Sequence, residues 1–294
     1  MNILFTGAFE PSIEEKALFE QNGHRVFFHR DEREIPADPQ KYDAVVCNGL
    51  FLYSPIEKFT GLKKIQLTSA GLDRVPLDKI EERKIELFTA RGVYSKPMAE
   101  YAVWAVLSFF KQSRYFENNQ KEHVWSKSRS LTELGEKSVC ILGCGDVGRE
   151  TAKLFKAFGC RVIGINRTKR SLPFFDEIFQ LENLYEAAKN CDILVSCIAL
   201  TEQTRGIISA DVFGALGSNA VFVNISRGAV ANEAALTAWL KSGGRAALDV
   251  FGSEPPDQSN PLWDMPNVII TPHNSFVGDG NHERLWKKIK ENLL

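Results

Sequence analysis

The feature that most constrains the fold is a glycine-rich turn that follows an apolar strand in the middle of the chain. Residues 138–142 (Ser-Val-Cys-Ile-Leu) have the composition of a buried strand, and Gly143, Gly145 and Gly148 follow them in a G-x-G-x-x-G pattern. The first glycine permits a tight turn, the second lets the backbone approach a pyrophosphate, and the third lets the next helix pack against the strand. The pattern therefore predicts a parallel α/β sheet with a dinucleotide site.

The helix that opens behind this turn supplies the second part of the expected site. Its first backbone N–H groups, those of Asp146 and Val147 among them, would face the phosphates, where the helix dipole favours negative charge. A glycine-rich turn that binds no ligand is the alternative interpretation. The position of the turn inside a strand–helix–strand unit favours the dinucleotide site.

Short apolar strands alternate with helical stretches along the whole sequence. The predicted strands are residues 2–6, 25–29, 44–48, 64–68 and 86–89 in the first half, and residues 138–142, 161–165, 192–197, 220–224, 246–250 and 268–270 in the second. Strands that are separated by crossovers pair in parallel and form α/β layers. We therefore expect two α/β halves.

A long helix is expected between the two halves, over about residues 97–119. Pro97 suits the first turn of a helix, and the apolar residues lie nearly all round it, which is typical of a buried helix. An interdomain hinge helix and an ordinary core helix both fit this pattern. The polar segment 117–136 is interpreted as an irregular arm or linker, and a last helix is expected over about residues 279–294.

Length and composition limit the classes of protein to consider. A chain of 294 residues suggests two domains, and the net charge of −1 gives no reason to expect a nucleic-acid or membrane partner. The longest apolar run, residues 101–110, is too short to span a bilayer, and no secretion signal is apparent at the start. The six cysteines lie in or beside apolar runs without a C-x-x-C pair. We expect buried thiols in a cytoplasmic protein, without disulfides or a metal site.

The loop after the strand 161–165 bears on which dinucleotide is bound. An acidic residue that binds the ribose of NAD is expected roughly 20 residues after the glycines, but the sequence there is Asn166-Arg167-Thr168-Lys169-Arg170. A carboxylate would repel a 2′-phosphate, whereas guanidinium and hydroxyl groups would bind it. The loop predicts that NADP(H) is preferred and that NAD(H) is possible; a solvated basic loop is the alternative.

Three further segments each lie near the end of a predicted strand. They are residues 224–228 (Asn-Ile-Ser-Arg-Gly), 248–255 (Leu-Asp-Val-Phe-Gly-Ser-Glu-Pro) and 271–274 (Thr-Pro-His-Asn). In a doubly wound sheet, ligands bind beyond the carboxyl ends of the strands. Arg227, Glu254 and His273 are therefore candidates to converge on one crevice.

These three residue types suit the reduction of a ketone by hydride. The oxygen of the ketone must take up a proton, and histidine is a suitable donor near neutral pH. A carboxylate such as Glu254 fixes the tautomer of the histidine and stabilises its imidazolium form. Arg227 would orient a substrate carboxylate and polarise the carbonyl. Taken singly, each residue has a structural interpretation as a core histidine, a salt-bridge arginine or a solvated acid.

The combination of motifs resembles the D-isomer-specific 2-hydroxyacid dehydrogenase family. The resemblance runs from about Leu67 to Phe276 and is strongest between Val139 and His273. The segments that carry it are GCGDVG (143–148), LTEQTRGII (200–208), NISRG (224–228), LDVFGSEP (248–255), PLWDMPNV (261–268) and TPH (271–273). The basic loop after Asn166 resembles the glyoxylate and hydroxypyruvate reductase branch.

The resemblance implies a Rossmann cofactor domain, residues 97–276, inserted into a flavodoxin-like substrate-binding domain, residues 1–96 and 277–294. Both would be doubly wound parallel sheets. It also implies closure of the two domains over the substrate and a homodimer formed through the cofactor domains. The arm at 117–136 would contribute to the homodimer.

The resemblance implies roles for particular residues. Arg227, Glu254 and His273 would form the catalytic set, and Asp249 would lie by the nicotinamide. Thr204, Ala199 and Ile225 are further expected cofactor residues. The amides of Ala70 and Gly71 would hold the substrate carboxylate, as a turn of successive N–H groups binds anions, with Leu50 and Arg227 as further substrate residues.

The sequence departs from the family pattern at several positions. Ala199 stands where proline is usual, Asn166 replaces the usual acid, and Phe276 is larger than the usual residue after the histidine.

The main hypothesis is reduction of a small 2-oxo acid, glyoxylate or hydroxypyruvate among the candidates, to the (R)-2-hydroxy acid. The alternative is an NAD(P)-sensing binding protein or corepressor that kept the fold. A different Rossmann enzyme, such as a methyltransferase, has no use for this set.

Overall fold

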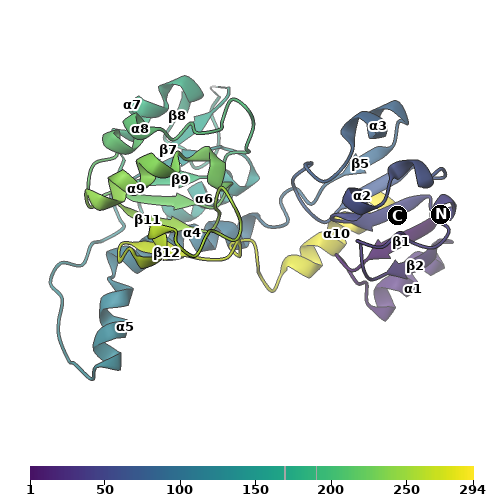
Figure 1. The fold of residues 1–294 in the computed structure, drawn as a ribbon, viewed down its shortest axis with the longest axis horizontal. Coiled ribbons are helices and arrows are strands. Elements are labelled where there is room, and N and C mark those ends of the chain that lie inside the picture. The colour runs from purple at the N-terminus through teal and green to yellow at the C-terminus, as the bar shows by residue number, and fades with distance from the viewer. Residues whose placement is uncertain (169, 190) are drawn as a thin grey trace. The chain divides into compact units, whose positions relative to one another are not determined.

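The chain forms two compact units, each built round a parallel β-sheet (Figure 1). The computed structural model describes residues 1–168, 170–189 and 191–294. Unit 1 comprises Met1–Val93 and Gly278–Leu294, and unit 2 comprises Tyr94–Val277. The predicted fold class, two parallel-sheet α/β domains, is confirmed.

Unit 1 has a five-stranded parallel sheet in the order β2-β1-β3-β4-β5, which is the flavodoxin-like order. Its elements are β1 (Asn2–Thr6), α1 (Ile13–Gln21), β2 (Arg25–His29), β3 (Ala44–Cys47), α2 (Leu50–Tyr53), β4 (Lys64–Leu67), α3 (Leu77–Glu82), β5 (Glu86–Phe88) and α10 (Asn281–Leu293), with 3-10 turns at Pro39–Lys41 and Ile56–Lys58. The last helix returns to this sheet: the Asn292 amide donates to Gln66 Oε1 at 2.7 Å, and Ile289 is fully buried.

Unit 2 has a seven-stranded parallel sheet in the order β12-β11-β10-β9-β6-β7-β8. Its elements are α4 (Ser95–Phe110), α5 (Ser113–Lys121), β6 (Ser138–Leu142), α6 (Asp146–Ala157), β7 (Arg161–Asn166), β8 (Glu177–Gln180), α7 (Leu184–Ala188), β9 (Ile193–Ser196), α8 (Ala210–Ala215), β10 (Val221–Asn224), α9 (Glu233–Lys241), β11 (Arg245–Leu248) and β12 (Val268–Ile270), with 3-10 turns at Leu181–Asn183, Gly228–Val230 and Pro261–Asp264. The strand order reverses between β6 and β9, so a crevice opens there at the carboxyl ends.

Alternation along β6 divides the core of unit 2 into two layers. Val139 and Ile141 point to the face covered by α4 and α6, whereas Cys140 and Leu142 point to the face covered by α7, α8 and α9. All four side chains are fully buried. A parallel strand that is covered on both faces must be apolar throughout, which is why the sequence around the glycine turn predicts it so clearly.

The predicted strands are all present, and their ends differ from the expected ones by at most two residues. β8 was not predicted. It lies at the edge of the sheet and only Ile178 of its residues is buried. A short edge strand with one buried side chain has too little apolar pattern to be recognised.

The single helix predicted over residues 97–119 is wrong. The chain forms α4 and α5 instead, because Gln112 between them has φ 54°, in the left-handed region that ends a helix. The expected irregular segment 117–136 is also wrong at its start, which belongs to α5; the remainder forms no regular element. In Figure 1, α5 and the chain that follows it extend away from the sheet of unit 2.

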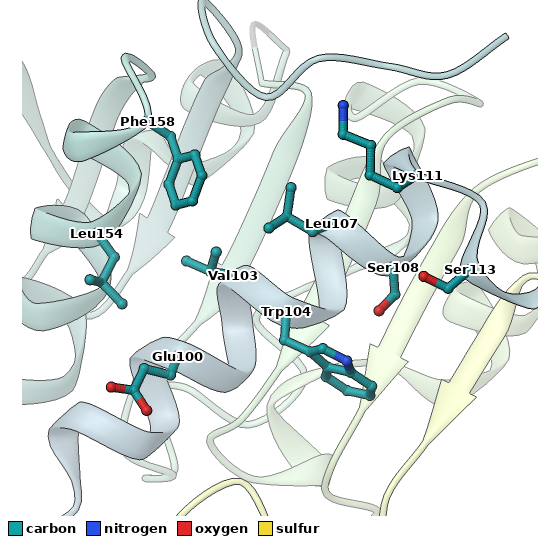
Figure 2. Close-up of a pocket in the computed structure, with 9 residues that line it drawn as sticks. All are labelled: Glu100, Val103, Trp104, Leu107, Ser108, Lys111, Ser113, Leu154 and Phe158. Carbon is teal, nitrogen blue, oxygen red and sulfur yellow. The ribbon is translucent and has the colours of Figure 1, made fainter. Parts of the chain in front are cut away.

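A shallow apolar groove of 530 Å³ lies between α4, α6 and the start of α5. Figure 2 shows Val103 and Leu107 of α4 facing Leu154 and Phe158, with Trp104 beside them. Trp104 and Phe158 are 48% and 46% exposed. The groove is therefore an apolar surface that unit 2 leaves open.

The environment of the cysteines agrees with their interpretation as small apolar residues. All six are free thiols, and all except the half-buried Cys197 are buried. None of the helices formed by the described residues is both long and apolar enough to cross a membrane.

Candidate active site

The turn between β6 and α6 requires glycine at two positions. Gly143 has φ +99°, and a Cβ there would lie 2.8 Å from the backbone nitrogen of Ile198. A Cβ on Gly148 would lie 2.0 Å from the carbonyl oxygen of Gly143. Any side chain at either position would force the backbone of the turn apart.

The same turn has open space where a pyrophosphate would lie. Gly145 is exposed, and a Cβ there would have no neighbour within 4 Å. As the N-cap of α6, Gly145 has no side chain to accept from the first amides, those of Asp146 and Val147. The Asp146 carboxylate is turned towards Arg149, with which it forms an ion pair. The turn therefore fits the phosphates of a dinucleotide, with the helix dipole favouring the anion.

The loop at the end of β7 is basic and exposed. Asn166 is the last residue of β7, and its side-chain amide donates to the Thr168 carbonyl at 3.3 Å. Arg167 and Thr168 are exposed, and Arg167 has no ion-pair partner among the described residues. Lys169, which belongs to the same basic run, lies outside the described residues.

The positive charge of Arg170 acts on a residue of the glycine turn. Burial raises the pKa of the Cys144 thiol to about 12, and the positive charge of Arg170 acts in the opposite direction. Cys144 stands between Gly143 and Gly145, so the charge of Arg170 favours an anion at the expected dinucleotide site.

The hydroxyl group of Thr204 makes hydrogen bonds across the turn after β9. Thr204 Oγ1 donates to the Ala199 carbonyl at 2.7 Å and accepts from the Thr201 amide at 2.7 Å. Thr204 is buried, as is Ile225 at the end of β10. These side chains shape the backbone of the expected cofactor site rather than project into solvent.

Arg227, Glu254 and His273 follow three neighbouring parallel strands. β10 pairs with β11, and β11 pairs with β12, so the three loops leave one edge of the sheet. The loops are packed tightly: a Cβ on Gly228 would lie 1.9 Å from the carbonyl carbon of Phe251. Glycine at this position lets the arginine loop lie directly against the loop that leads to Glu254.

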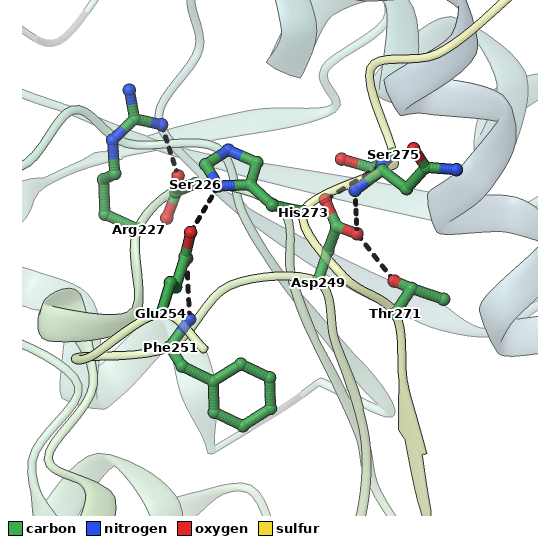
Figure 3. Close-up of polar contacts among 9 residues, drawn as sticks. Ser226, Arg227, Asp249, Phe251, Glu254, Thr271, His273 and Ser275 are labelled. Carbon is green, nitrogen blue, oxygen red and sulfur yellow. Dashed lines mark hydrogen bonds and ion pairs between the residues drawn. The ribbon is translucent and has the colours of Figure 1, made fainter. Parts of the chain in front are cut away.

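The structure brings His273 and Glu254 into contact. His273 Nδ1 lies 2.7 Å from Glu254 Oε2, and Glu254 Oε1 accepts from the Phe251 amide at 3.0 Å. Figure 3 shows the carboxylate between the histidine ring and this amide. Both side chains are partly exposed, at 40% and 38%. The carboxylate thus fixes Nδ1 and leaves Nε2 for a substrate.

The arginine loop is fixed by its own neighbours. Arg227 donates from Nη1 to the Ser226 carbonyl at 2.7 Å, and the Asn224 amide donates to the Arg227 carbonyl at 3.1 Å. Within the described chain no carboxylate forms an ion pair with Arg227. Its remaining N–H groups suit a planar carboxylate.

The expected substrate residues of unit 1 differ in their exposure. Ala70 is exposed, and among the described residues the amides of Ala70 and Gly71 donate no hydrogen bond. Leu50, in contrast, is fully buried in the core of unit 1. The side chain of Leu50 therefore has no open surface for a ligand, because the first residue of α2 anchors that helix to the sheet.

Two sets of hydrogen bonds, one in each unit, were not predicted. The Glu32 carboxylate accepts from the amides of Asn48 and Gly49 at 2.7 and 2.5 Å, and so fixes the turn before α2. Tyr101 and Thr271 are linked by a hydrogen bond of 2.7 Å. No local spacing indicates either contact, since the partners lie 16 or more residues apart.

Comparison with known proteins agrees with this geometry. Residues 103–275 match the family model described as D-isomer specific 2-hydroxyacid dehydrogenase, NAD binding domain. Glyoxylate/hydroxypyruvate reductase A HPR2 of Arabidopsis thaliana is 32% identical over 237 residues, which cover 78% of this chain and 72% of that protein. Glyoxylate/hydroxypyruvate reductase A of Salmonella paratyphi B is also 32% identical over 237 residues, covering 76% and 74%.

The solved structures agree as well. A D-isomer specific 2-hydroxyacid dehydrogenase from Xanthobacter autotrophicus Py2, in complex with NADPH and MES, has a TM-score of 0.78 and 28% identity; the match covers 99% of this chain and 94% of that one. The chain thus belongs to the D-isomer specific 2-hydroxyacid dehydrogenase family, and it is an oxidoreductase with a nicotinamide cofactor.

The glycine turn gives a direct test of the cofactor site. Gly148→Ala should raise the Kd for NADPH at least about tenfold, because its Cβ would displace the turn that is expected to bind the pyrophosphate. Gly214→Ala is the matched control, since Gly214 lies in α8 with open space around it. That change should stabilise the protein by about 0.5–1 kcal/mol and leave NADPH binding unchanged. Fluorescence titration and thermal unfolding measure both; equal Kd values for the two variants would contradict the expectation.

Proposed function

We propose that the protein reduces a small 2-oxo acid of the glyoxylate or hydroxypyruvate kind to the (R)-2-hydroxy acid. The observation that carries the proposal is the contact of 2.7 Å between His273 Nδ1 and Glu254 Oε2. It lies at the same sheet edge as the glycine turn, since β6, β9, β10, β11 and β12 are consecutive neighbours in the sheet. A bound nicotinamide would supply the hydride, and reduction of the carbonyl also needs a proton donor of this kind.

His273 is the proposed proton donor. Because Glu254 engages Nδ1, the transferable proton resides on Nε2, which delivers it to the carbonyl oxygen of the substrate as that oxygen gains charge. The carboxylate of Glu254 stabilises the imidazolium form before the transfer and holds the ring in one orientation. In the oxidative direction the same nitrogen accepts the proton.

Arg227 is the proposed substrate anchor. Its guanidinium keeps one N–H on Ser226 and presents the others to the substrate carboxylate and carbonyl. In unit 1, the Ala70 and Gly71 amides are proposed to bind a substrate carboxylate, as successive backbone amides form an anion-binding concavity. Binding the carboxylate fixes the face of the carbonyl that receives the hydride.

A substrate panel tests the reaction, and paired variants test the residues. Wild-type protein should consume NADPH with glyoxylate and hydroxypyruvate faster than with bulkier 2-oxo acids, as followed by absorbance. His273→Gln and Glu254→Gln should lower kcat roughly 100-fold to 10,000-fold, since each removes a part of the proton donor.

The matched control is the second His–Glu pair, in which His282 Nε2 lies 3.0 Å from Glu15 Oε1 in unit 1. His282→Gln should retain the wild-type kcat. A wild-type protein that binds NADPH but reduces no member of the panel would overturn the proposal and favour an NAD(P)-sensing binding protein.

We further propose that NADP(H) is the preferred cofactor, with NAD(H) as a weaker substitute. The support is the segment Asn166–Thr168, which lacks an acid and in which Arg167 and Thr168 are exposed, together with the positive charge of Arg170, which acts on Cys144 of the glycine turn. A free guanidinium at Arg167 suits a 2′-phosphate, whereas an acid would suit the ribose 2′-hydroxyl of NAD.

Exchange of the loop residues tests this preference. Arg167→Gln should raise the KM for NADPH roughly 10-fold to 100-fold, through loss of a charged hydrogen bond, and change the KM for NADH little. Arg161→Gln is the control, because Arg161 lies at the opposite end of β7 and pairs with Glu177. If wild-type protein gives equal kcat/KM with NADPH and NADH, the proposed preference is wrong.

We also propose that the protein is a cytoplasmic homodimer. Free, buried thiols suit a reducing compartment. The exposed groove on α4 and α6 is an apolar surface, and Trp125 in the arm after α5 is 96% exposed; a second copy would cover both.

Light scattering tests the homodimer. The chain has a mass of 33.0 kDa, so the mass measured by light scattering for wild-type protein should be twice this value. Trp104→Glu should yield the monomer, because it places a charge in the groove. Trp263→Glu is the matched control, since Trp263 is 49% exposed and lies outside the groove. A monomeric wild-type protein, or dimers in all three cases, would count against this interface.

A further inference from the structure

The backbone turn that carries His273 has an unusual conformation. His273 has φ 51°, in the left-handed region that side chains with a Cβ seldom adopt. Such a conformation persists only where the surrounding contacts hold it. One of these contacts is the amide of His273, which donates to the carbonyl oxygen of Asp249 at 2.8 Å.

The side chain of Asp249 holds the residues on both sides of His273. Its Oδ1 accepts from Thr271 Oγ1 at 2.6 Å and from the Asn274 amide at 2.7 Å, and its Oδ2 accepts from the Ser275 amide at 2.9 Å. Figure 3 shows the contacts of Asp249 with Thr271 and Ser275 on the side of the turn away from Glu254. Asp249 is only 1% exposed, so water does not compete for them.

Tyr101 extends this network by one residue. Its hydroxyl lies 2.7 Å from Thr271 Oγ1. The single hydroxyl proton of Thr271 goes to Asp249, because a carboxylate can only accept. Tyr101 must therefore donate to Thr271, and the order of donors is Tyr101, Thr271, Asp249. Burial raises the pKa of Tyr101 to about 12, so the phenol keeps the proton that it donates.

Tyr101, at the far end of this series of hydrogen bonds, is anchored in the core. Tyr101 belongs to α4, whose buried residues pack with Val139 of β6, Val223 of β10 and Ala247 of β11. Its ring also contacts that of Trp104, with centroids 5.2 Å apart. A helix fixed in this way gives the hydrogen-bonded chain a rigid support.

We propose that Tyr101 and Thr271 are positioning residues for the reaction: with Asp249 they form a chain of hydrogen bonds that fixes the turn of His273. The proposal rests on the proposed role of His273 as proton donor. The chain holds the backbone from one side while Glu254 holds the imidazole from the other. Proton transfer depends strongly on the placement of the donor, so loss of the chain should lower the rate more than it weakens binding.

Substitution of single hydroxyl groups tests the chain. Thr271→Val and Tyr101→Phe each remove one hydroxyl and nearly preserve the shape. We expect kcat for the best 2-oxo acid to fall about 10-fold, with the KM for NADPH within about 2-fold of wild type, because transition-state interactions are lost and ground-state binding is kept. Thr271→Ser retains the hydroxyl and should retain most of the rate.

The matched control is Tyr42→Phe in unit 1. Tyr42 is 4% exposed and its hydroxyl donates to the Ala37 carbonyl at 3.2 Å, so the change removes a buried hydroxyl of the same kind. Its kcat should equal that of wild type. An equal loss of kcat in Tyr42→Phe, or in Thr271→Ser and Thr271→Val alike, would overturn the positioning role.

A second measurement separates this proposal from the proposed function. The protein has five histidines, so the imidazole NMR signals of ¹⁵N-labelled protein are few, and His273→Gln identifies the one of interest. Thr271→Val should shift or broaden the His273 signal and leave the other four in place. An unchanged His273 signal would overturn the proposal. This holds even if wild-type protein reduced no 2-oxo acid, an outcome that would overturn only the proposed function.

Discussion

The parallel register of β10, β11 and β12 is the constraint on which the site depends. The three strands pair residue by residue, so the loops that carry Arg227, Glu254 and His273 must leave one edge of the sheet. Parallel pairing requires a crossover before each next strand, and these crossovers form the core layers on the two faces. The same backbone hydrogen bonds thus account for the fold and for the proximity of residues up to 46 positions apart.

Two carboxylates contact different parts of the turn that carries His273. Glu254 is partly exposed and contacts the imidazole, where a charge can respond to the substrate. Asp249 is buried and accepts hydrogen bonds from Thr271 and from the amides of the turn, and these fixed donors stabilise its charge. The difference in burial explains why residues five positions apart serve the ring and the backbone separately.

Much of this arrangement could be read from local patterns. Buried strands such as β6 are recognisable because a parallel strand covered on both faces is apolar throughout, and the glycine turn because the steric limits at Gly143 and Gly148 leave no other residue. The break between α4 and α5 at Gln112 and the edge strand β8 could not be predicted from the sequence. Neither a residue with a left-handed backbone nor a strand with the single buried residue Ile178 produces a periodic pattern.

The sequence by itself determined two α/β domains, the glycine turn and the identity of the three polar residues at the strand ends, because each depends on residues close together in the chain. Only the tertiary structure decided which of these residues meet. It joined His273 to Glu254, buried Leu50 in a core, and linked Tyr101 to Asp249 through Thr271. The physical reason is that hydrogen bonds between distant segments follow from sheet register and helix packing, which no local spacing encodes.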